Sequence, residues 1–259
     1  MRRHAKFFGF TFIFALLSVL SGIAVLNVIV DPAHVFASKA YEDGIARNLA
    51  AGMHTVGVDN YDDRLLQRYY LKHAGFKRDV IVLGSSRSYQ WRARHFAGQF
   101  FNHSVNGNRL EDLLAIYGLY ELQNTHPKTV VLGLDPWILN ENVGSSPIES
   151  LEQSYSIMLR KLGAELNLME RRWMRNEKRL QTMFSLAYAR RSIGMLLKNA
   201  PRVDGDYFAS DGDNFDLPVK RADGSFRYSA AYRHLSVDEV RDAAVAAARE
   251  GNTWGSKGY

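Results

Sequence analysis

An uncharged stretch near the N-terminus restricts this chain more than any other feature. Phe7 to Val30 contains 24 residues and no Asp, Glu, Lys or Arg. As an α-helix rising ~1.5 Å per residue it is roughly 36 Å long, more than the ~30 Å hydrocarbon core of a bilayer. We therefore expect residues 7–30 to form a single transmembrane helix that anchors the chain in a membrane.

The charges around this stretch predict its orientation. Three basic residues lie within positions 1–6, and Asp31 follows the stretch. Basic residues stay on the cytoplasmic side, so we expect the N-terminus inside and everything after Asp31 outside. A cleaved signal peptide is the alternative. Its apolar region usually has only about 7–15 residues, and the possible cleavage sites here carry Phe or Lys near the cut.

Composition excludes several kinds of function. The net charge is +6, and half of it comes from the three basic residues before the apolar stretch. The other basic residues are dispersed, so we expect no nucleic-acid partner. The chain has no cysteine, which excludes thiol catalysis and cysteine-ligated zinc and fits an oxidising compartment without disulfides. We expect no metal and no cofactor.

The remaining sequence predicts one extracytoplasmic domain. Residues 31–60 are expected to be a linker with one helix near Tyr41–Ala51, and residues 61–259 to form the domain. Asp62–Ala74 has its apolar residues on one helical face, and Gly75 ends it. With 46% hydrophobic residues in 259, the chain can form one sizeable core.

Three apolar segments predict a parallel sheet, so we expect the α/β class. They are Asp79–Gly84, Phe100–Val105 and Thr129–Leu134, and the first has the unbroken apolar run of a strand buried on both faces. Helices are expected between them at Ser86–Ala97 and Arg109–Asn124. Alternating strands and helices within a short span are typical of right-handed crossovers.

The second half of the chain has weaker signals. Ile148–Asn199 is expected to be a mostly helical insertion, with a solvated charge run at Glu170–Arg179. The acidic loop Asp204–Asp216 suggests calcium, but no Glu closes it as in an EF-hand, so a plain exposed loop is favoured. Leu217–Tyr228 predicts a hairpin around Asp223-Gly224. A capping box at Ser236–Glu239 opens a helix that Gly251 is expected to end.

Polar residues follow each predicted strand and should meet at one edge of the sheet. They are Ser85 and Ser86, then Asn106, Gly107 and Asn108, and finally Asp135. In open α/β sheets ligands bind at the carboxyl ends of the strands. A serine at a strand-to-helix turn can be an exposed nucleophile beside backbone N–H groups. An isolated Gly-Ser-Ser would more simply cap a helix, and the other two tips favour the site.

The three segments also resemble a family. The blocks IVLGSSRS, NHSVNGN and VVLGLDPW are similar in order and spacing to the first three blocks of SGNH (GDSL-type) hydrolases. They look closer still to the membrane-anchored, SGNH-like bacterial proteins such as the teichoic-acid D-alanyl transfer and alginate O-acetylation proteins, and the anchor followed by Asp31-Pro32 also resembles that group. The resemblance implies a flavodoxin-like, three-layer α/β domain in the periplasm, held to the bacterial inner membrane.

The resemblance also implies roles for the residues at the strand tips. Ser86 would be the nucleophile, and its N–H and that of Gly107 would bind the oxyanion. Asp135 stands where the family has an oxyanion-binding Asn, and an ionised carboxylate would repel an oxyanion. Asn106 or Asn108 could donate instead. Arg87 could hold an anionic substrate or pair with Asp135.

The family's general base, an Asp-x-x-His, is the missing part. Its one occurrence is Asp31-Pro32-Ala33-His34, beside the membrane, and His103, His126 and His234 lack a triad-like setting. One interpretation is that the chain is incomplete: three strands are few for this class, and residues 251–259 read like an interior loop. The other is a natural, non-catalytic relative.

Three hypotheses follow from these features. The leading one is a membrane-anchored esterase or O-acyltransferase for a cell-envelope polysaccharide, with Ser86 as nucleophile and an acyl-donor membrane protein as a possible partner. The second is a non-catalytic binding or assembly protein. The third is a phosphate-binding enzyme that uses Gly84–Arg87 as an anion nest, although no Walker Lys-Ser/Thr follows.

Overall fold

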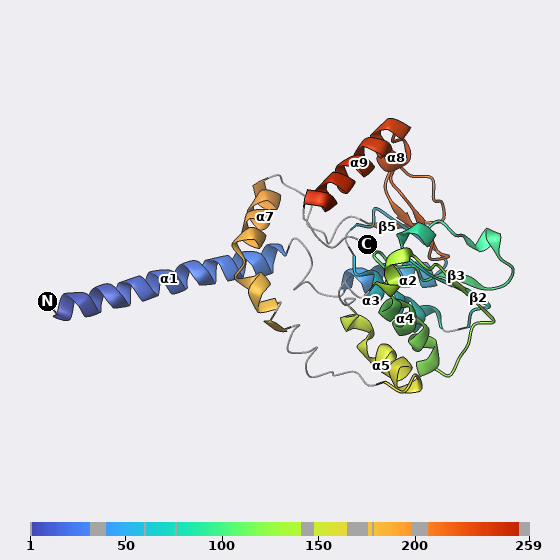
Figure 1. Ribbon diagram of the computed structural model, residues 1–259, viewed down its shortest axis with the longest axis horizontal. Coiled ribbons are helices and arrows are strands. Elements are labelled where there is room, and N and C mark those ends of the chain that lie inside the picture. The colour runs from blue at the N-terminus through green and yellow to red at the C-terminus, as the bar shows by residue number, and fades with distance from the viewer. Residues whose placement is uncertain are drawn as a thin grey trace. The chain divides into compact units, whose positions relative to one another are not determined.

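The chain folds into two units, which we describe separately. The computed structural model describes residues 2–31, 40–59, 61–75, 77–140, 148–164, 176–177, 179–197 and 207–253 (Figure 1). The first unit, here called the helical unit, comprises Met1–Lys39 and Leu166–Gly205. The second, here called the α/β unit, comprises Ala40–Glu165 and Asp206–Tyr259.

The helical unit contains the long apolar helix. Helix α1 (Arg2–Val30) includes one segment, Phe10–Val30, that is long and apolar enough to span a membrane. A second helix, α7 (Leu186–Leu197), lies across α1 near the C-terminal end of α1 (Figure 1). The solvated charge run predicted at Glu170–Arg179 falls mostly outside the described residues.

The α/β unit contains the predicted parallel sheet. Strands β2 (Val80–Leu83), β3 (Phe100–Asn102) and β4 (Thr129–Leu132) pair in the order β3-β2-β4, with β2 parallel to both neighbours. This is the order in which a doubly wound, flavodoxin-like sheet begins. Every residue of β2 is buried, as its apolar run predicts.

Strand β4 is the exposed member of this sheet. Among the described residues it pairs with β2 alone, so its other edge carries no strand. Thr129 and Leu132 are exposed, and Leu134 just beyond the strand is 68% exposed. On the opposite side, β3 is covered by the turn Arg221–Ser225, since the N–H of Asn102 donates to the carbonyl of Asp223 at 2.9 Å.

A second sheet was not predicted. It is antiparallel, has the order β5-β1-β6-β7, and consists of the strands β1 (His54–Val56), β5 (Phe208–Ser210), β6 (Val219–Lys220) and β7 (Phe226–Arg227). Strands β6 and β7 form the hairpin expected around Asp223-Gly224. Strand β1 and the predicted helix, α2 (Ala40–Ala50), come from the segment expected to be a linker.

The expected helix at Ser86–Ala97 is wrong. The chain forms two short 3₁₀ turns instead, η1 (Ser86–Ser88) and η2 (Ala93–His95). The side chain of Asn102 on β3 donates from Nδ2 to the carbonyls of Ser88 at 2.7 Å and Trp91 at 3.0 Å. Both carbonyls therefore bond to the sheet, and the N–H of Trp91 donates to the carbonyl of Ser88 at 3.2 Å in a tight turn, so the chain does not continue as an α-helix.

The other helices largely match the sequence. Helix α3 (Asp63–Ala74) is capped by the Asp62 carboxylate, and Gly75 ends it with φ +73°. The others in the α/β unit are α4 (Leu110–Leu122), η3 (Pro136–Leu139), η5 (Glu149–Leu151), α5 (Glu152–Lys161), α8 (Ala230–Arg233) and α9 (Val237–Thr253). Ser236 and Glu239 form the predicted capping box. Helix α9 continues past Gly251, where an end was expected.

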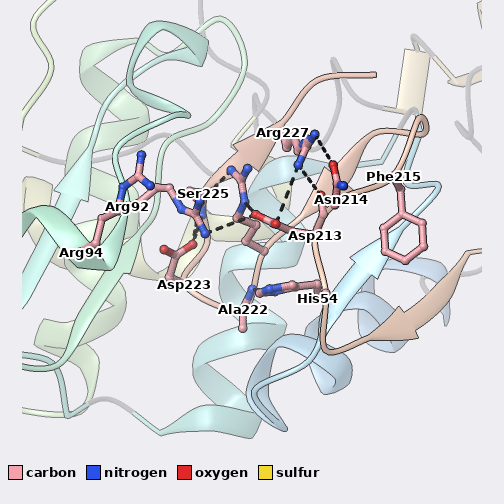
Figure 2. Close-up of polar contacts among 12 residues, drawn as sticks. His54, Arg92, Arg94, Asp213, Asn214, Phe215, Ala222, Asp223, Ser225 and Arg227 are labelled. Carbon is pink, nitrogen blue, oxygen red and sulfur yellow. Dashed lines mark hydrogen bonds and ion pairs between the residues drawn. The ribbon is translucent and has the colours of Figure 1, made fainter. Parts of the chain in front are cut away.

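Asp213, in the described part of the acidic loop, lies among three arginines. Asp213 lies 2.5 Å from Arg221 Nε, 3.3 Å from Arg92 Nη2 and 3.8 Å from Arg227 Nη1 (Figure 2). Burial raises the pKa of Asp213, but the hydrogen bond and charge of Arg221, with the charges of the other two arginines, outweigh this effect and lower the pKa.

Asp204 and Asp206, which suggested calcium, lie outside the described residues. Within the part described, no three acidic or histidine side chains gather as metal ligands.

Candidate functional site

The three strand tips meet at one edge of the parallel sheet, as the sequence predicts. Beyond β3, the N–H of Val105 donates to the carbonyl of Gly84 at 2.9 Å. Beyond β4, the N–H of Gly133 donates to the carbonyl of Leu83 at 2.8 Å. The turn that carries Ser85 and Ser86 therefore lies between the other two tips.

Two glycines allow β2 and β4 to approach closely beneath this turn. A Cβ atom at Gly84 would lie 2.5 Å from Ser88 Oγ and 3.4 Å from the Cα of Gly133. A Cβ atom at Gly133 would lie 3.2 Å from the Cα of Gly84. Ser88 is buried over both glycines. The glycines before Ser85 and Asp135 thus have a packing role that is independent of any reaction.

Ser85 and Ser86 have different surroundings. Ser85 is buried, and its Oγ accepts from the N–H of Arg87 at 3.2 Å, so it caps the turn η1. Ser86 is partly exposed, and within the part of the chain that is described its Oγ has no hydrogen-bond partner. The capping interpretation therefore holds for Ser85, and Ser86 is the serine whose hydroxyl is available.

The second tip offers two kinds of donor. Gly107 is exposed with φ +58°, and its N–H donates to no acceptor in the described residues. Asn106 is exposed, whereas Asn108 is fully buried and neither its Oδ1 nor its Nδ2 has a partner among the described residues. A buried amide without partners is costly, and of the two amides at this tip only Asn106 is at the surface.

The start of α3 holds this loop in place. Asp63 Oδ2 accepts from the N–H of Asn106 at 2.9 Å and from the hydroxyl of Tyr89 at 2.7 Å. Arg64 donates to both carboxylate oxygens of Asp112, at 2.8 Å each, and to the carbonyl of Asn106 at 3.3 Å. Sequence reasoning missed both residues, although two charges inside the first turn of an otherwise apolar helix face were a signal.

The third tip places a carboxylate beside Arg87, the residue that follows Ser86. Asp135 Oδ1 lies 3.4 Å from Arg87 Nη1, and the Arg87 guanidinium lies over the Trp137 ring, 4.7 Å from its centroid. The pairing of Arg87 with Asp135 that the sequence raised is therefore present. The indole Nε1 of Trp137 in turn donates to the carbonyl of Asn108 at 3.0 Å, which links the second and third tips.

The candidate histidines lie away from Ser86. His103 is fully buried, with its ring nitrogens 2.8 Å from Gln67 Oε1 and 2.7 Å from the Tyr120 hydroxyl. Burial holds the pKa of His103 well below its usual range, so the ring is neutral. His126 is exposed near Glu121, and His234 is exposed at the end of α8. In the described structure no histidine hydrogen-bonds to Ser86.

A separate cavity of about 470 Å³ lies among α3, α4 and η5. Its lining includes Arg68, Leu119 and Ser150 and none of the strand-tip residues. The strand tips are thus an open edge of the sheet, and this cavity is no part of the site.

Comparison with known proteins adds nothing to this geometry: no family model matches the chain, and no curated protein or solved structure matches it. The function is therefore inferred from the residues themselves.

Proposed function

We propose that this chain is a membrane-anchored, SGNH-like esterase or O-acyltransferase that acts on a cell-envelope polysaccharide outside the bacterial cytoplasmic membrane. The observation that carries the proposal is the partly exposed, unpartnered hydroxyl of Ser86 at the carboxyl end of the central strand β2. This is the edge at which parallel sheets bind ligands. The apolar helix α1 supports the anchor.

The proposed reaction uses the groups at the strand tips. Ser86 Oγ attacks the carbonyl carbon of an ester, and the alcohol leaves to give an acyl-serine. Water or a sugar hydroxyl then takes the acyl group and regenerates the serine. The N–H groups of Ser86 and Gly107 are the donors for the oxyanion, and such a donor is worth about 10²–10³ in rate.

The proton of Ser86 needs a base, since a neutral serine is a weak nucleophile. His103 is not that base, because it is buried between Gln67 and Tyr120. The catalytic proposal therefore requires a base that the hydrogen bonds of the described structure do not supply.

The test is labelling by a serine-reactive fluorophosphonate probe, with the full chain in detergent or vesicles. The expected result is labelling of the unsubstituted protein, loss of labelling in Ser86→Ala, and retained labelling in Ser85→Ala. The Ser85 variant is the matched control, because it removes a neighbouring hydroxyl that only caps η1. Equal labelling of Ser86→Ala and the unsubstituted protein would exclude Ser86 as the nucleophile.

A non-catalytic binding or assembly protein is the second candidate. It is favoured by the carboxylate of Asp135 at the position of an oxyanion donor and by the absence, in the described part, of a histidine beside Ser86. Under this proposal the probe labels nothing, while the protein retains envelope polysaccharide fragments on an affinity column. Labelling of Ser86 would reject it.

A further inference from the structure

Helix α7 is fastened to the C-terminal end of α1 by a buried asparagine. Asn27 is fully buried, and its Nδ2 lies within hydrogen-bond distance of three carbonyls, at 3.2 Å from Thr182, 3.0 Å from Met183 and 3.0 Å from Ser185. These three carbonyls precede the first turn of α7. A single polar side chain of the apolar helix thus fixes where α7 begins.

A second set of contacts fixes the middle of α7 at the same level. The hydroxyl of Tyr188 donates to Asp31 Oδ1 at 2.6 Å, and Ser192 Oγ lies 3.5 Å from Asn27 Oδ1. Ala189 and Ser192 are buried. The hydrogen bonds that Tyr188 and Ser192 make therefore hold α7 at the C-terminal end of α1.

These contacts set the depth of α7 relative to a bilayer. Twenty residues at ~1.5 Å each fill the ~30 Å hydrocarbon core, and the uncharged stretch from Phe7 to Val30 is about four residues longer than that. If Phe7–Leu26 fill the core, Asn27 and Asp31 lie at the outer interface. Helix α7, which is bonded to both, lies there too, and it runs across α1 rather than along it (Figure 1).

The exposed side chains of α7 suit that position. The large apolar ones are Leu186, Ile193, Leu196 and Leu197. Two adjacent basic residues, Arg190 and Arg191, are also exposed. An apolar face with basic residues beside it is the pattern of a helix that lies in the membrane interface.

The contact between the two helices leaves an apolar hollow. It measures about 360 Å³ and lies between the Val19–Leu26 part of α1 and the Leu186–Ile193 part of α7. Its lining is aliphatic or glycine apart from Arg190, and it consists of Val19, Gly22, Ile23 and Leu26 of α1 and Leu186, Ala189, Arg190 and Ile193 of α7. Such a hollow suits a hydrocarbon chain.

We propose that α7 is a second membrane contact: an interfacial helix in the outer leaflet, with its leucine and isoleucine side chains among lipid acyl chains. Arg190 and Arg191 contact the phosphates of phospholipid headgroups, and an acyl chain occupies the hollow beside α1. This inference rests on the membrane anchor of the proposed function, and it does not depend on Ser86.

The absence of cysteine from the chain makes a clean test possible. Single cysteines are introduced by Leu197→Cys, Leu17→Cys and Leu139→Cys, and the full chain is spin-labelled in phosphatidylglycerol-phosphatidylcholine vesicles. Accessibility to oxygen, which concentrates in lipid, is compared with accessibility to a water-soluble nickel complex. Leu197 on α7 is 81% exposed and Leu139 in the α/β unit is 83% exposed, so they form a matched pair.

The expected result is that positions 17 and 197 are severalfold more accessible to oxygen than to nickel, while position 139 shows the reverse. If position 197 behaves like position 139 while position 17 is in lipid, the inference about α7 is wrong and the anchor stands. If position 17 is also in water, the membrane anchor itself fails. All three substitutions are at exposed positions, so loss of folding does not obscure the outcome.

Discussion

Arg87 Nη1 lies 3.4 Å from Asp135 Oδ1, so the residue that follows the candidate nucleophile is ion-paired to the carboxylate at the tip of β4. The pair joins the first and third strand tips. It also accounts for an aspartate at a position where an oxyanion would be repelled, because the arginine offsets the charge of the carboxylate.

The first prediction concerns this pair. Asp135→Asn removes a negative charge beside the proposed oxyanion, so the rate of fluorophosphonate labelling at Ser86 should rise roughly tenfold, or ~1.4 kcal/mol in the barrier. Arg87→Gln leaves the carboxylate without its partner and should slow labelling. Asp135→Asn should change stability by only about 0–1 kcal/mol, because the Arg87 guanidinium that it leaves behind is exposed. Slower labelling in Asp135→Asn would contradict this account.

The second prediction concerns the buried pair between α3 and α4. Asp112→Asn leaves the Arg64 guanidinium without its bidentate carboxylate, which should destabilise the protein by about 3–5 kcal/mol. The measurement is urea unfolding of the full chain in detergent, followed by tryptophan fluorescence. The matched control is Asp238→Asn, which breaks an exposed pair with Arg241 and should cost less than about 1 kcal/mol. Similar urea midpoints for the two variants would show that the Arg64–Asp112 ion pair contributes little to the stability of the fold.

The third prediction is that His103 is structural. His103→Gln should cost about 1–3 kcal/mol at neutral pH through its contacts to Gln67 and Tyr120. It should leave labelling of Ser86 per folded molecule unchanged. A loss of labelling without a loss of folded protein would assign His103 a direct role.

His103 also gives a pH signature. Burial lowers its pKa in the folded state, so its contribution to stability is fully present above the unfolded value of ~6.5 and is lost as the pH falls toward the folded value. The unsubstituted protein should therefore lose more stability than His103→Gln between pH 7 and pH 5, as measured by urea midpoints.

The fourth prediction concerns the Asp213 cluster. The pKa of Asp213 is lowered in the folded state, so its contribution is present above the unfolded value of ~3.9 and is lost as the pH falls through the folded value. Asp213→Asn should cost about 1–3 kcal/mol at pH 6 and much less at pH 3. An equal loss of stability at pH 6 and pH 3 would mean that the charge of Asp213 does not stabilise its contacts with the three arginines. Asp211→Asn, in the same loop but outside this ion-pair set, is the control.

The sequence predicted the parallel sheet because its signals are local and strong. The run from Val80 to Leu83 is long enough to show burial on both faces, and α3 has both a capping residue and a terminating glycine. The meeting of the three tips followed from parallel pairing alone. It therefore needed no knowledge of side-chain contacts.

The antiparallel sheet was missed because its strands are too short to show a period. Its β6–β7 hairpin was expected, but β1 and β5 have three residues each and pair across more than 150 residues of sequence. The helix at Ser86–Ala97 failed for a related reason, since Asn102, a single side chain on another strand, takes up two of its carbonyls. Neither interaction leaves a local trace in the sequence.

The edge of β4 has a practical consequence for anyone who purifies this protein. In the described structure its outer backbone groups face no neighbouring strand, and Leu132, at 51% exposure, and Leu134 lie alongside them. An open, apolar edge is a template for strand addition, so aggregation should increase steeply with concentration. Leu132→Lys, a change of the kind with which natural proteins protect such edges, should keep the sample monodisperse without touching Ser86.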